Sequence, residues 1–478
     1  MAQPINSFDI FDTLIARHGC DPHSVLRLLE LRAGIPGLAA ARREADRALG
    51  MKGQAYELRD IWRHVGSTLA LSNDDTKRMM QMELGLEHDA VIPIAENLAL
   101  VRDGDVLVSD TYLAAETVMS LLRRAGFDRR VGLVVTNDGK WRGWIWPRLL
   151  EQVAIREHMG DNPHADGQTA AAAGIRAIIY TGSQRSPVEK FLAKEGWEEL
   201  ANLVREVRLA CPFSGARPRE RHLWGLTCQL NFPLLYFASL WLDQVARASN
   251  VRRIHFVSRD CLLWHGLFEH LFPESCANYF YASRRCLLAP TPSYLEYFQS
   301  VWHKDDLIVD LLSTGISWSR LFSRLNRKAR CFFIGHMDNY AYLEDVTRWQ
   351  DWLEIQTVFR NSELGPPLNK NLEMLNYAPH ARVEDVRLIA GAFPVPALAE
   401  SLEYASSLPE AARQCFTVCV QKLGSPWNGA PIPNDKLAAV IKTLIGLIGA
   451  DRQLDRIYAG HRAKDEAYME SILNDVRK

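Results

Sequence analysis

The first 185 residues alternate short apolar runs with amphipathic stretches, and this alternation constrains the fold more than any other feature of the chain. Short apolar runs are typical of strands that are buried on both faces of a parallel sheet. They occur at 5–11, 106–108, 133–135 and 177–180, and helix-like stretches lie at 114–125, 146–157 and 167–173. A repeated strand–helix order predicts a parallel sheet with right-handed crossovers, of the Rossmann-like α/β class.

A long segment without strand-like runs, 21–99, follows the first predicted strand. It is rich in Ala, Leu, Arg and Glu at helical spacing, and Asn73 and Asp74 form a candidate helix cap. We interpret this segment as a helical insert that covers one end of the sheet. Residues 1–20 and 100–205 would then form the α/β core.

The rest of the chain predicts a second α/β region and a helical end. Segment 206–222 contains Pro, Gly and several Arg, and it is interpreted as a linker. Residues 223–380 have further strand-like runs, and residues 381–478 are predicted to be helical. The runs of the second region are 254–257, 278–282, 307–312 and 331–334.

Polar side chains gather after the predicted strands of the first region. Ligands of open α/β sheets bind outside the carboxyl ends of the strands, so these side chains are the candidates for chemistry. They are Asp9, Asp12 and Thr13, then Ser109, Asp110 and Thr111, then Asp138 and Lys140, and finally Asp161 and Asp166. An aspartate can attack phosphorus, and carboxylates bind a hard cation such as Mg²⁺. Serine and lysine hold phosphate oxygens, so the set favours phosphoryl transfer.

Four segments carry a resemblance to a known family. FDIFDTL, VLVSDTYL, a downstream lysine and HMGDNPHAD resemble, in order, the four motifs of the haloacid dehalogenase (HAD) superfamily. They are most similar to a subfamily of predicted hydrolases with an FDIFDTL start and an SDxYL second motif. The resemblance covers about residues 5–185 and implies that the helical insert is a C1-type cap.

The resemblance implies a role for each matching residue. Asp9 would be the nucleophile and a metal ligand, Phe11 would offer its backbone carbonyl to the metal, and Ser109 would bind phosphate. Asp161 and Asp166 would be the remaining metal ligands. Lys140 is the best candidate for the third motif, and Arg142 lies two residues further along the chain.

The first motif departs from the pattern of HAD phosphatases, which usually have a second aspartate two residues after the nucleophile. Phe11 occupies that position, and Asp12 is one residue out of register. Because neighbouring residues of a strand face opposite sides, two roles stay open for Asp12: an acid that protonates the leaving group, or a structural residue of the turn. Dehalogenase and phosphonatase branches also lack this acid, whose loss typically lowers the rate by about 10² to 10⁴.

The second region has one loop that suits a phosphorylated ligand. A predicted strand runs into small residues before a helix, where backbone N–H groups can bind phosphate. The loop is similar to the phosphoribosyl-pyrophosphate loop of type I phosphoribosyltransferases, which implies binding by Asp310, Ser313, Thr314, Gly315 and Ser317. The match is partial, because Val309 and Ser313 stand where acidic residues are usual. A repurposed Rossmann-like domain that binds a phosphorylated ligand is therefore favoured. Three arginines at predicted strand ends would suit such a ligand: Arg259, Arg284 and Arg285. The competing interpretation for Arg259 is an ion pair with Asp260.

Composition excludes several other classes of function. Lys and Arg number 56 against 57 Asp and Glu, so bulk affinity for nucleic acid or an anionic membrane is not expected. The most apolar stretch, 232–242, is shorter than the roughly 20 residues that a membrane span needs. The start of the chain lacks the pattern of a secretory signal, and nine scattered cysteines without a CxxC pair predict reduced thiols in a cytoplasmic protein. His158 and His164 lack the further ligands of a zinc site.

The sequence therefore predicts a Mg²⁺-dependent HAD-type hydrolase that acts on a small phosphorylated substrate through an aspartyl-phosphate. Two alternatives are a phosphoribosyltransferase-like activity in the second region and a non-catalytic ligand-binding or scaffold protein.

Overall fold

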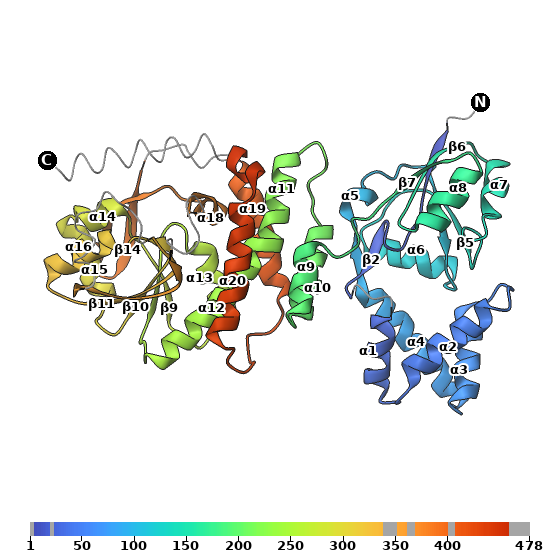
Figure 1. Cartoon of the computed structure of the whole chain (residues 1–478), viewed down its shortest axis with the longest axis horizontal. Helices are drawn as coiled ribbons and strands as arrows, with labels where there is room; N and C mark the ends of the chain where they lie inside the picture. The colour runs from blue at the N-terminus through green and yellow to red at the C-terminus, as the bar shows by residue number, and fades with distance from the viewer. Residues whose placement is uncertain (1–3, 20–22, 338–350, 361–368, 400–406, 458–478) are drawn as a thin grey trace. The chain divides into compact units, whose positions relative to one another are not determined.

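The computed structural model describes residues 4–19, 23–337, 351–360, 369–399 and 407–457, and the chain divides into two compact units, 1–216 and 217–478 (Figure 1). The boundary lies inside the predicted linker 206–222, but most of that segment is helical. Helix α10 (Glu198–Leu209) enters it from one side, and α11 (Pro218–Leu226) begins before it ends.

Unit 1 contains a five-stranded parallel sheet with the first strand in its centre. The strand order is β5-β4-β1-β6-β7, so the carboxyl ends of all five strands lie at one edge. The strands are β1 (Ile5–Phe8), β4 (Val106–Asp110), β5 (Gly132–Thr136), β6 (Ile155–Gly160) and β7 (Arg176–Ile179). The connecting helices are α6 (Ala115–Arg124), α7 (Ile145–Leu150), the π-helix η1 (Pro163–Gln168) with α8 (Thr169–Ala172), and α9 (Pro187–Lys194).

Strand β6 corrects the sequence interpretation, which placed 146–157 in one helix. Helix α7 ends at Leu150, and the chain then pairs with β1 and β7 through 155–160. Three residues of this strand are polar, so it lacks the apolar run that predicted the other strands: Arg156, Glu157 and His158. His158 is nevertheless fully buried, because its ring nitrogens contact Ser7 and Asp166.

The insert after β1 is mainly helical, as predicted, but it also contains a strand. Strand β2 (Ile15–Arg17) pairs antiparallel with β3 (Val91–Pro93), and this short ribbon joins the insert to the core. The helices are α1 (Ser24–Ala33), α2 (Leu38–Gly50), α3 (Leu58–Thr68) and α4 (Asn73–Ala90), and α5 (Ala95–Leu98) follows β3. One apolar cluster contains residues of both parts, for example Phe8 and Ile10 of the core and Leu29 of α1.

Unit 2 contains a second five-stranded parallel sheet, with the order β12-β11-β10-β8-β9. Its strands are β8 (Ile254–Val257), β9 (Ala277–Phe280), β10 (Leu307–Ser313), β11 (Ala329–His336) and β12 (Leu353–Arg360). The chain adds β9 on one side of β8 and β10–β12 on the other, so the order reverses between β8 and β10. Strand β12 was missed by the sequence analysis. The other four strands lie where short apolar runs predicted them.

Helices surround this sheet, and one hairpin corrects the prediction for 381–478. Helices α19 (Ser407–Lys422) and α20 (Asn434–Gly449) agree with that prediction, but β13 (Val383–Ile389) and β14 (Phe393–Leu398) form an antiparallel pair. Gly391 at the turn has φ +67°, and Pro394 and Pro396 disfavour a helix. The remaining helices are η2 (Thr227–Asn231), α12 (Phe232–Ala248), α13 (Leu262–Leu271), α14 (Arg284–Leu288), α15 (Pro292–Val301), α16 (Ile316–Leu325) and α18 (Asn369–Leu375).

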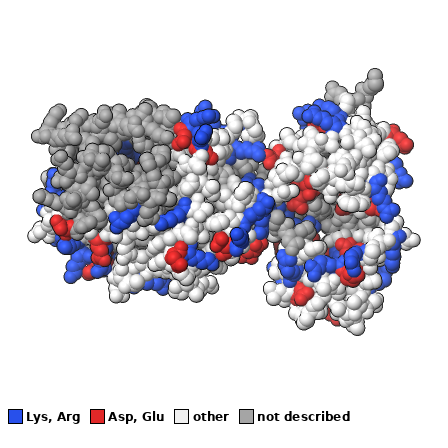
Figure 2. Space-filling model, viewed as in Figure 1, with Lys and Arg blue, Asp and Glu red and all other residues white. Residues whose placement is uncertain are grey.

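Three features bear on the class predictions from composition. Within the described part of the chain, no helix is long and apolar enough to cross a membrane. Basic and acidic side chains are interspersed over the face shown in Figure 2. The eight cysteines in the described ranges have free thiols, and Cys20 lies outside those ranges.

Candidate metal centre and active site

Asp9 is the first residue after the central strand of unit 1, and its side chain is held from two sides. Its backbone N–H donates to the carbonyl oxygen of Met159 at 2.8 Å, which joins it to β6. The Thr13 hydroxyl donates to Asp9 Oδ2 at 3.2 Å. The residue is 5% exposed. The centre of the sheet edge therefore presents a carboxylate in a fixed position.

Asp166 reaches the same place from the π-helix η1, which follows β6. The Asn162 side chain caps this helix by accepting from the N–H groups of His164 and Ala165, each at 3.0 Å. The Asn162 N–H donates to Asp166 Oδ2 at 3.0 Å. A Cβ atom on Gly160 would lie 2.2 Å from Asp166 Cγ, so only glycine leaves room for this carboxylate. A π-turn of this kind is frequent at functional sites.

Asp161 completes a cluster of three carboxylates with Asp9 and Asp166. One oxygen of each lies within 4.8 Å of the others, which is a spacing that could hold a metal ion. Among the described residues none donates a hydrogen bond to the Asp161 carboxylate. Burial and the charges of Asp9 and Asp12 raise the pKa of Asp161 to about 7. An all-oxygen donor set with excess negative charge fits a hard divalent cation.

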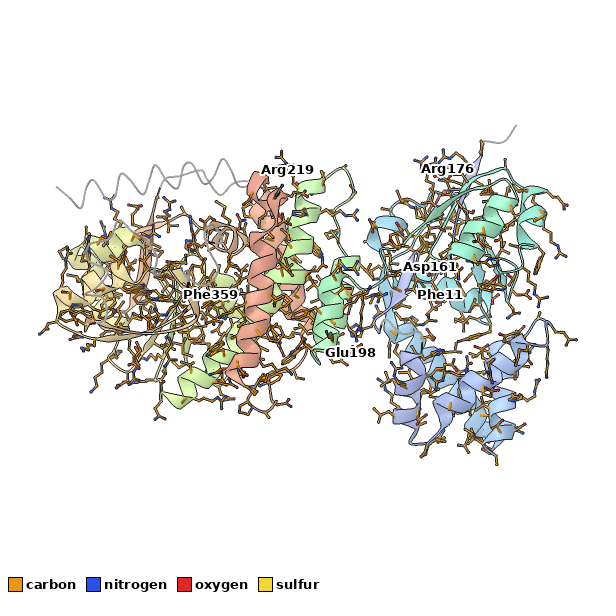
Figure 3. All side chains as sticks on the ribbon, in the orientation of Figure 1. Phe11, Asp161, Arg176, Glu198, Arg219 and Phe359 are labelled. Atoms are coloured by element: carbon orange, nitrogen blue, oxygen red, sulfur yellow. The ribbon has the colours of Figure 1, made fainter. Side chains whose placement is uncertain are left out.

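Asp161 and Phe11 lie toward the side of the sheet that faces α1–α4 (Figure 3). Arg176, the first residue of β7, lies at the opposite edge. The carboxyl ends of the strands therefore meet the helical insert.

Lys140 extends from the loop between β5 and α7 into this cluster. Its ammonium donates to Asp9 Oδ1 and, at 2.7 Å, to Asp166 Oδ1. Burial alone would lower the pKa of Lys140, but the charges of Asp9 and Asp166 raise it above its usual value. The alternative candidate, Arg142, is 56% exposed and pairs with Asp138 at 2.6 Å. The structure thus brings Lys140, and not Arg142, to the cluster.

Lys140 lowers the pKa of both Asp9 and Asp166, but their net pKa shifts are opposite. Burial raises the pKa of Asp9 to about 6, although the charge of Lys140 opposes the shift. For Asp166 burial acts in the same direction, but the hydrogen bond from His158 and the charge of Lys140 lower its pKa to about 2. Asp166 is therefore a fixed anion that helps to hold the lysine.

Asp110 has a role that the sequence analysis missed. It holds the loop that carries Lys140. It accepts from the Thr136 hydroxyl at 2.5 Å and from the backbone N–H groups of Lys140 and Trp141 at 3.1 and 3.0 Å. The sequence feature that could have indicated this role is that Asp110 directly follows Ser109 in the second motif. Asp110 is a positioning residue.

His158 is a second residue whose part was missed. Its Nε2 donates to Asp166 Oδ1 at 3.1 Å, and Nδ1 accepts from the Ser7 hydroxyl at 2.9 Å. The ring packs against Trp146 with centroids 4.6 Å apart. Burial lowers the pKa of His158, so its ring is neutral and holds Asp166 in place through a hydrogen bond.

Asp12 is not one of the three clustered carboxylates, although its charge raises the pKa of Asp161. Its backbone is left-handed, with φ +56°, and its carboxylate accepts from Arg205 Nη2 at 3.4 Å. Arg205 also donates to the carbonyl oxygen of Arg17, so Asp12 and Arg205 support the β2 ribbon. The Phe11 ring lies under the Arg17 guanidinium, 4.7 Å from its centroid.

A cavity of about 670 Å³ opens between the sheet edge and the insert. Phe11, Asp110 and Thr111 line it from the core. The basic residues of its wall are Arg17, His23, Arg42, Arg43 and Arg47. Ser109 is buried at the end of β4, beside the segment that carries Asp9.

The candidates of the second region lie in unit 2 and form a separate set. Asp310, Ser313, Thr314 and Ser317 line a cavity of about 230 Å³ at the carboxyl edge of the second sheet. Gly315, with φ +77°, immediately precedes α16.

Comparisons with protein-family models and with curated proteins give no match to this chain. Its chemistry is therefore inferred from the geometry of the two sites.

Proposed function

We propose that unit 1 is a Mg²⁺-dependent phosphohydrolase of the HAD type. The observation that carries this proposal is the buried Asp9 carboxylate, which lies at the centre of the sheet edge within reach of Lys140, Asp161 and Asp166. The strand order and the helical insert after β1 resemble a HAD core with a C1-type cap, and they add support.

In the proposed reaction Asp9 supplies the nucleophilic oxygen. This oxygen forms a bond to phosphorus while the ester P–O bond breaks, and the leaving alkoxide takes the bonding electron pair and then a proton from water. Lys140 orients Asp9 and offsets the charge of the incoming phosphate, and the Ser109 hydroxyl would donate to a phosphate oxygen. Water then cleaves the aspartyl-phosphate and regenerates Asp9.

A divalent cation would be held by Asp9, Asp161 and Asp166, with the backbone carbonyl of Phe11 as a further candidate ligand. When bound it would neutralise charge on the phosphate oxygens and on the carboxylates. Asp161 fits this role best, because its carboxylate has three acidic neighbours and no hydrogen-bond donor among the described residues.

The substrate would be a small phosphorylated metabolite. The cavity between the sheet edge and the insert is large enough for one, and Phe11, two residues after Asp9, lines it. Its wall carries several basic side chains together with Asp46 and Glu87. Asp12 is assigned a structural role here, because its carboxylate contacts Arg205 and it does not belong to the carboxylate cluster.

The test is a panel of phosphomonoesters with Mg²⁺, comparing the wild type with Asp9→Asn. We expect turnover that requires the metal and falls to background in Asp9→Asn. Asp103→Asn is the matched control, because Asp103 is an exposed acid that pairs with Arg130. Metal-dependent turnover that survives Asp9→Asn contradicts the mechanism, and metal binding without any turnover favours a non-catalytic ligand-binding protein.

A further inference from the structure

A second cavity lies in unit 2 where the strand order of its sheet reverses. Residues in the carboxyl-terminal parts of β8 and β10 and in the segments after β8, β9 and β10 line it. Glu373 and Tyr377 of the α18 region and Arg382 before β13 complete the wall. Doubly wound sheets bind ligands at such a reversal, because the connections leave in opposite directions and open a crevice between them. The cavity of about 230 Å³ is therefore in the expected place for a ligand site.

The wall of this cavity combines positive and negative side chains. Four arginines and three acids line it: Arg259, Arg284, Arg285, Arg382, Asp260, Asp310 and Glu373. Arg285 also pairs with Glu384 at 3.1 Å. The Arg259 guanidinium lies over the Tyr377 ring, 3.5 Å from its centroid, and its Nε lies 3.4 Å from Asp260. Arg284 is exposed at the mouth, and its charge lowers the pKa of all three acids, so it is close to each of them.

The balance of charge in the cavity is positive near neutral pH. Burial raises the pKa of Asp310 to about 7 and that of Glu373 to about 8, in each case helped by the charge of Asp260. Arginine stays protonated throughout this range. The cavity is thus prepared for an anion, and its partly protonated acids can still accept or donate hydrogen bonds.

Hydroxyl groups complete the wall beside helix α16. The Thr314 hydroxyl oxygen accepts from the Ile316 N–H at 3.3 Å, so its own proton is directed away from that bond. Ser317, in the first turn of α16, faces the cavity as well. Trp318, Leu287 and Val383 supply apolar surface. Fixed cations, carboxyls and hydroxyls on an apolar wall match a ligand that has both a charged end and several hydroxyl groups.

We propose that this cavity binds a small phosphorylated polyol, with the phosphate on the arginines and the hydroxyl groups on Asp310 and Glu373. Arginine suits phosphate because its planar fork makes paired hydrogen bonds, and carboxyl groups accept from sugar hydroxyls. The volume lies below the roughly 300 to 1,000 Å³ of drug-sized ligand sites, so a monosaccharide phosphate fits better than a nucleotide. This site shares no residue with the proposed phosphohydrolase of unit 1.

The test is calorimetric titration of the full chain with glucose 6-phosphate, glucose and inorganic phosphate, in EDTA so that no divalent cation is available to unit 1. We expect glucose 6-phosphate to bind at least about tenfold more tightly than either fragment, because only it engages both halves of the wall. Arg284→Gln and Asp310→Asn should each weaken binding at least about tenfold. Arg324→Gln, an exposed arginine on the same α16, should leave it unchanged.

Three results would overturn this assignment. They are no binding of any probe, binding that neither Arg284→Gln nor Asp310→Asn weakens, and binding that is lost in Asp9→Asn. Arg284→Gln removes a charge that lowers the pKa of three buried acids, so its unfolding temperature is measured beside its affinity. Arg284→Lys keeps the charge and should restore part of the affinity. Hydrogen exchange of the full chain locates the ligand, with protection expected at 282–288 and 310–318. Because Asp9→Asn should abolish turnover and leave this binding intact, the two proposals can fail separately.

Discussion

At the scale of single residues, the main feature of the candidate active site is that several charged side chains are buried close together. Asp9, Asp161 and Asp166 are brought within a few ångströms of one another, and Lys140 is the cation that contacts two of them. Buried charges are tolerated when they are paired and hydrogen-bonded, and the hydrogen bonds from His158 and Thr13 serve this purpose. Asp161 is left as the carboxylate that a cation would satisfy.

Gly160 gives the sharpest steric prediction. Gly160→Ala would place Cβ on the Asp166 carboxylate and push it away from Lys140. We expect the phosphatase activity to fall by about 10² or more, because small displacements of catalytic groups have effects of this size. Gly85→Ala, at an exposed position of α4 where nothing lies within 4 Å, is the control for a general effect on folding. Full activity in Gly160→Ala would show that the position of Asp166 does not matter.

Asp12 can be assigned by comparing leaving groups. If Asp12 is structural, Asp12→Asn should change the rates for an alkyl phosphate and for p-nitrophenyl phosphate by the same factor. An acid role would instead lower only the alkyl phosphate rate, by about 10² to 10⁴, because nitrophenolate leaves without a proton. Steady-state kinetics on both substrates decides between the two.

At the scale of elements, the sequence predicted most of what forms the site. Asp9 and Lys140 follow strands β1 and β5, and Ser109 lies near the end of β4. These strands are apolar runs and are visible in the sequence for that reason. Strand β6 was missed because the contacts that bury its polar residues come from Ser7 on β1 and from Asp166 on η1. Such contacts are made between distant parts of the chain, and local periodicity carries no sign of them. The same holds for Asp110, whose partners lie 26 to 31 residues away.

Helix α2 of the insert contributes basic residues to the cavity, and they differ in what holds them. Arg42 is buried and donates to Glu83 at 2.8 Å, so it stabilises the insert. Arg43 is exposed and lines the cavity. For a substrate with a second anionic group, Arg43→Ala should raise KM by up to about tenfold with kcat unchanged. KM for p-nitrophenyl phosphate, and both constants in the control Arg32→Ala, should not change. An equal loss of kcat for both substrates would contradict this role.

At the scale of the whole molecule, two α/β units each present a polar site at the carboxyl edge of a parallel sheet. The sequence predicted an α/β region in each unit, but it set 381–478 apart as a helical region, and β13 and β14 form a hairpin within it. It also had no strand at 353–360, where the apolar residues of β12 alternate with polar ones. The cavity of unit 2 is lined by residues at strand ends and by residues near 373–382. Because these segments are far apart in the chain, no single motif predicted the full set of lining residues.

The buried acids of unit 2 make the stability of the chain depend on pH. Because the folded-state pKa of Asp310 is about 7, against an ordinary 3.8, the folded chain retains a proton that the unfolded chain releases above about pH 4. The contribution of Asp310 to stability therefore falls as pH rises toward 7, by at most about 4 kcal/mol. Asp310→Asn removes this loss, while Asp260, Glu373 and Arg284 remain nearby. The melting temperature of Asp310→Asn minus that of the wild type should therefore increase between pH 5 and pH 8. A difference that stays constant over this range would contradict the assignment.

The central claim is that Asp9 becomes phosphorylated during turnover. The direct measurement is mass spectrometry of peptides from the full chain, quenched with acid while it hydrolyses a phosphomonoester in Mg²⁺. The account predicts one added phosphoryl group on the peptide that contains Asp9, and none in Asp9→Asn or after the metal is chelated. Turnover with an unmodified Asp9 peptide throughout, or with the phosphoryl group on another residue, would contradict it.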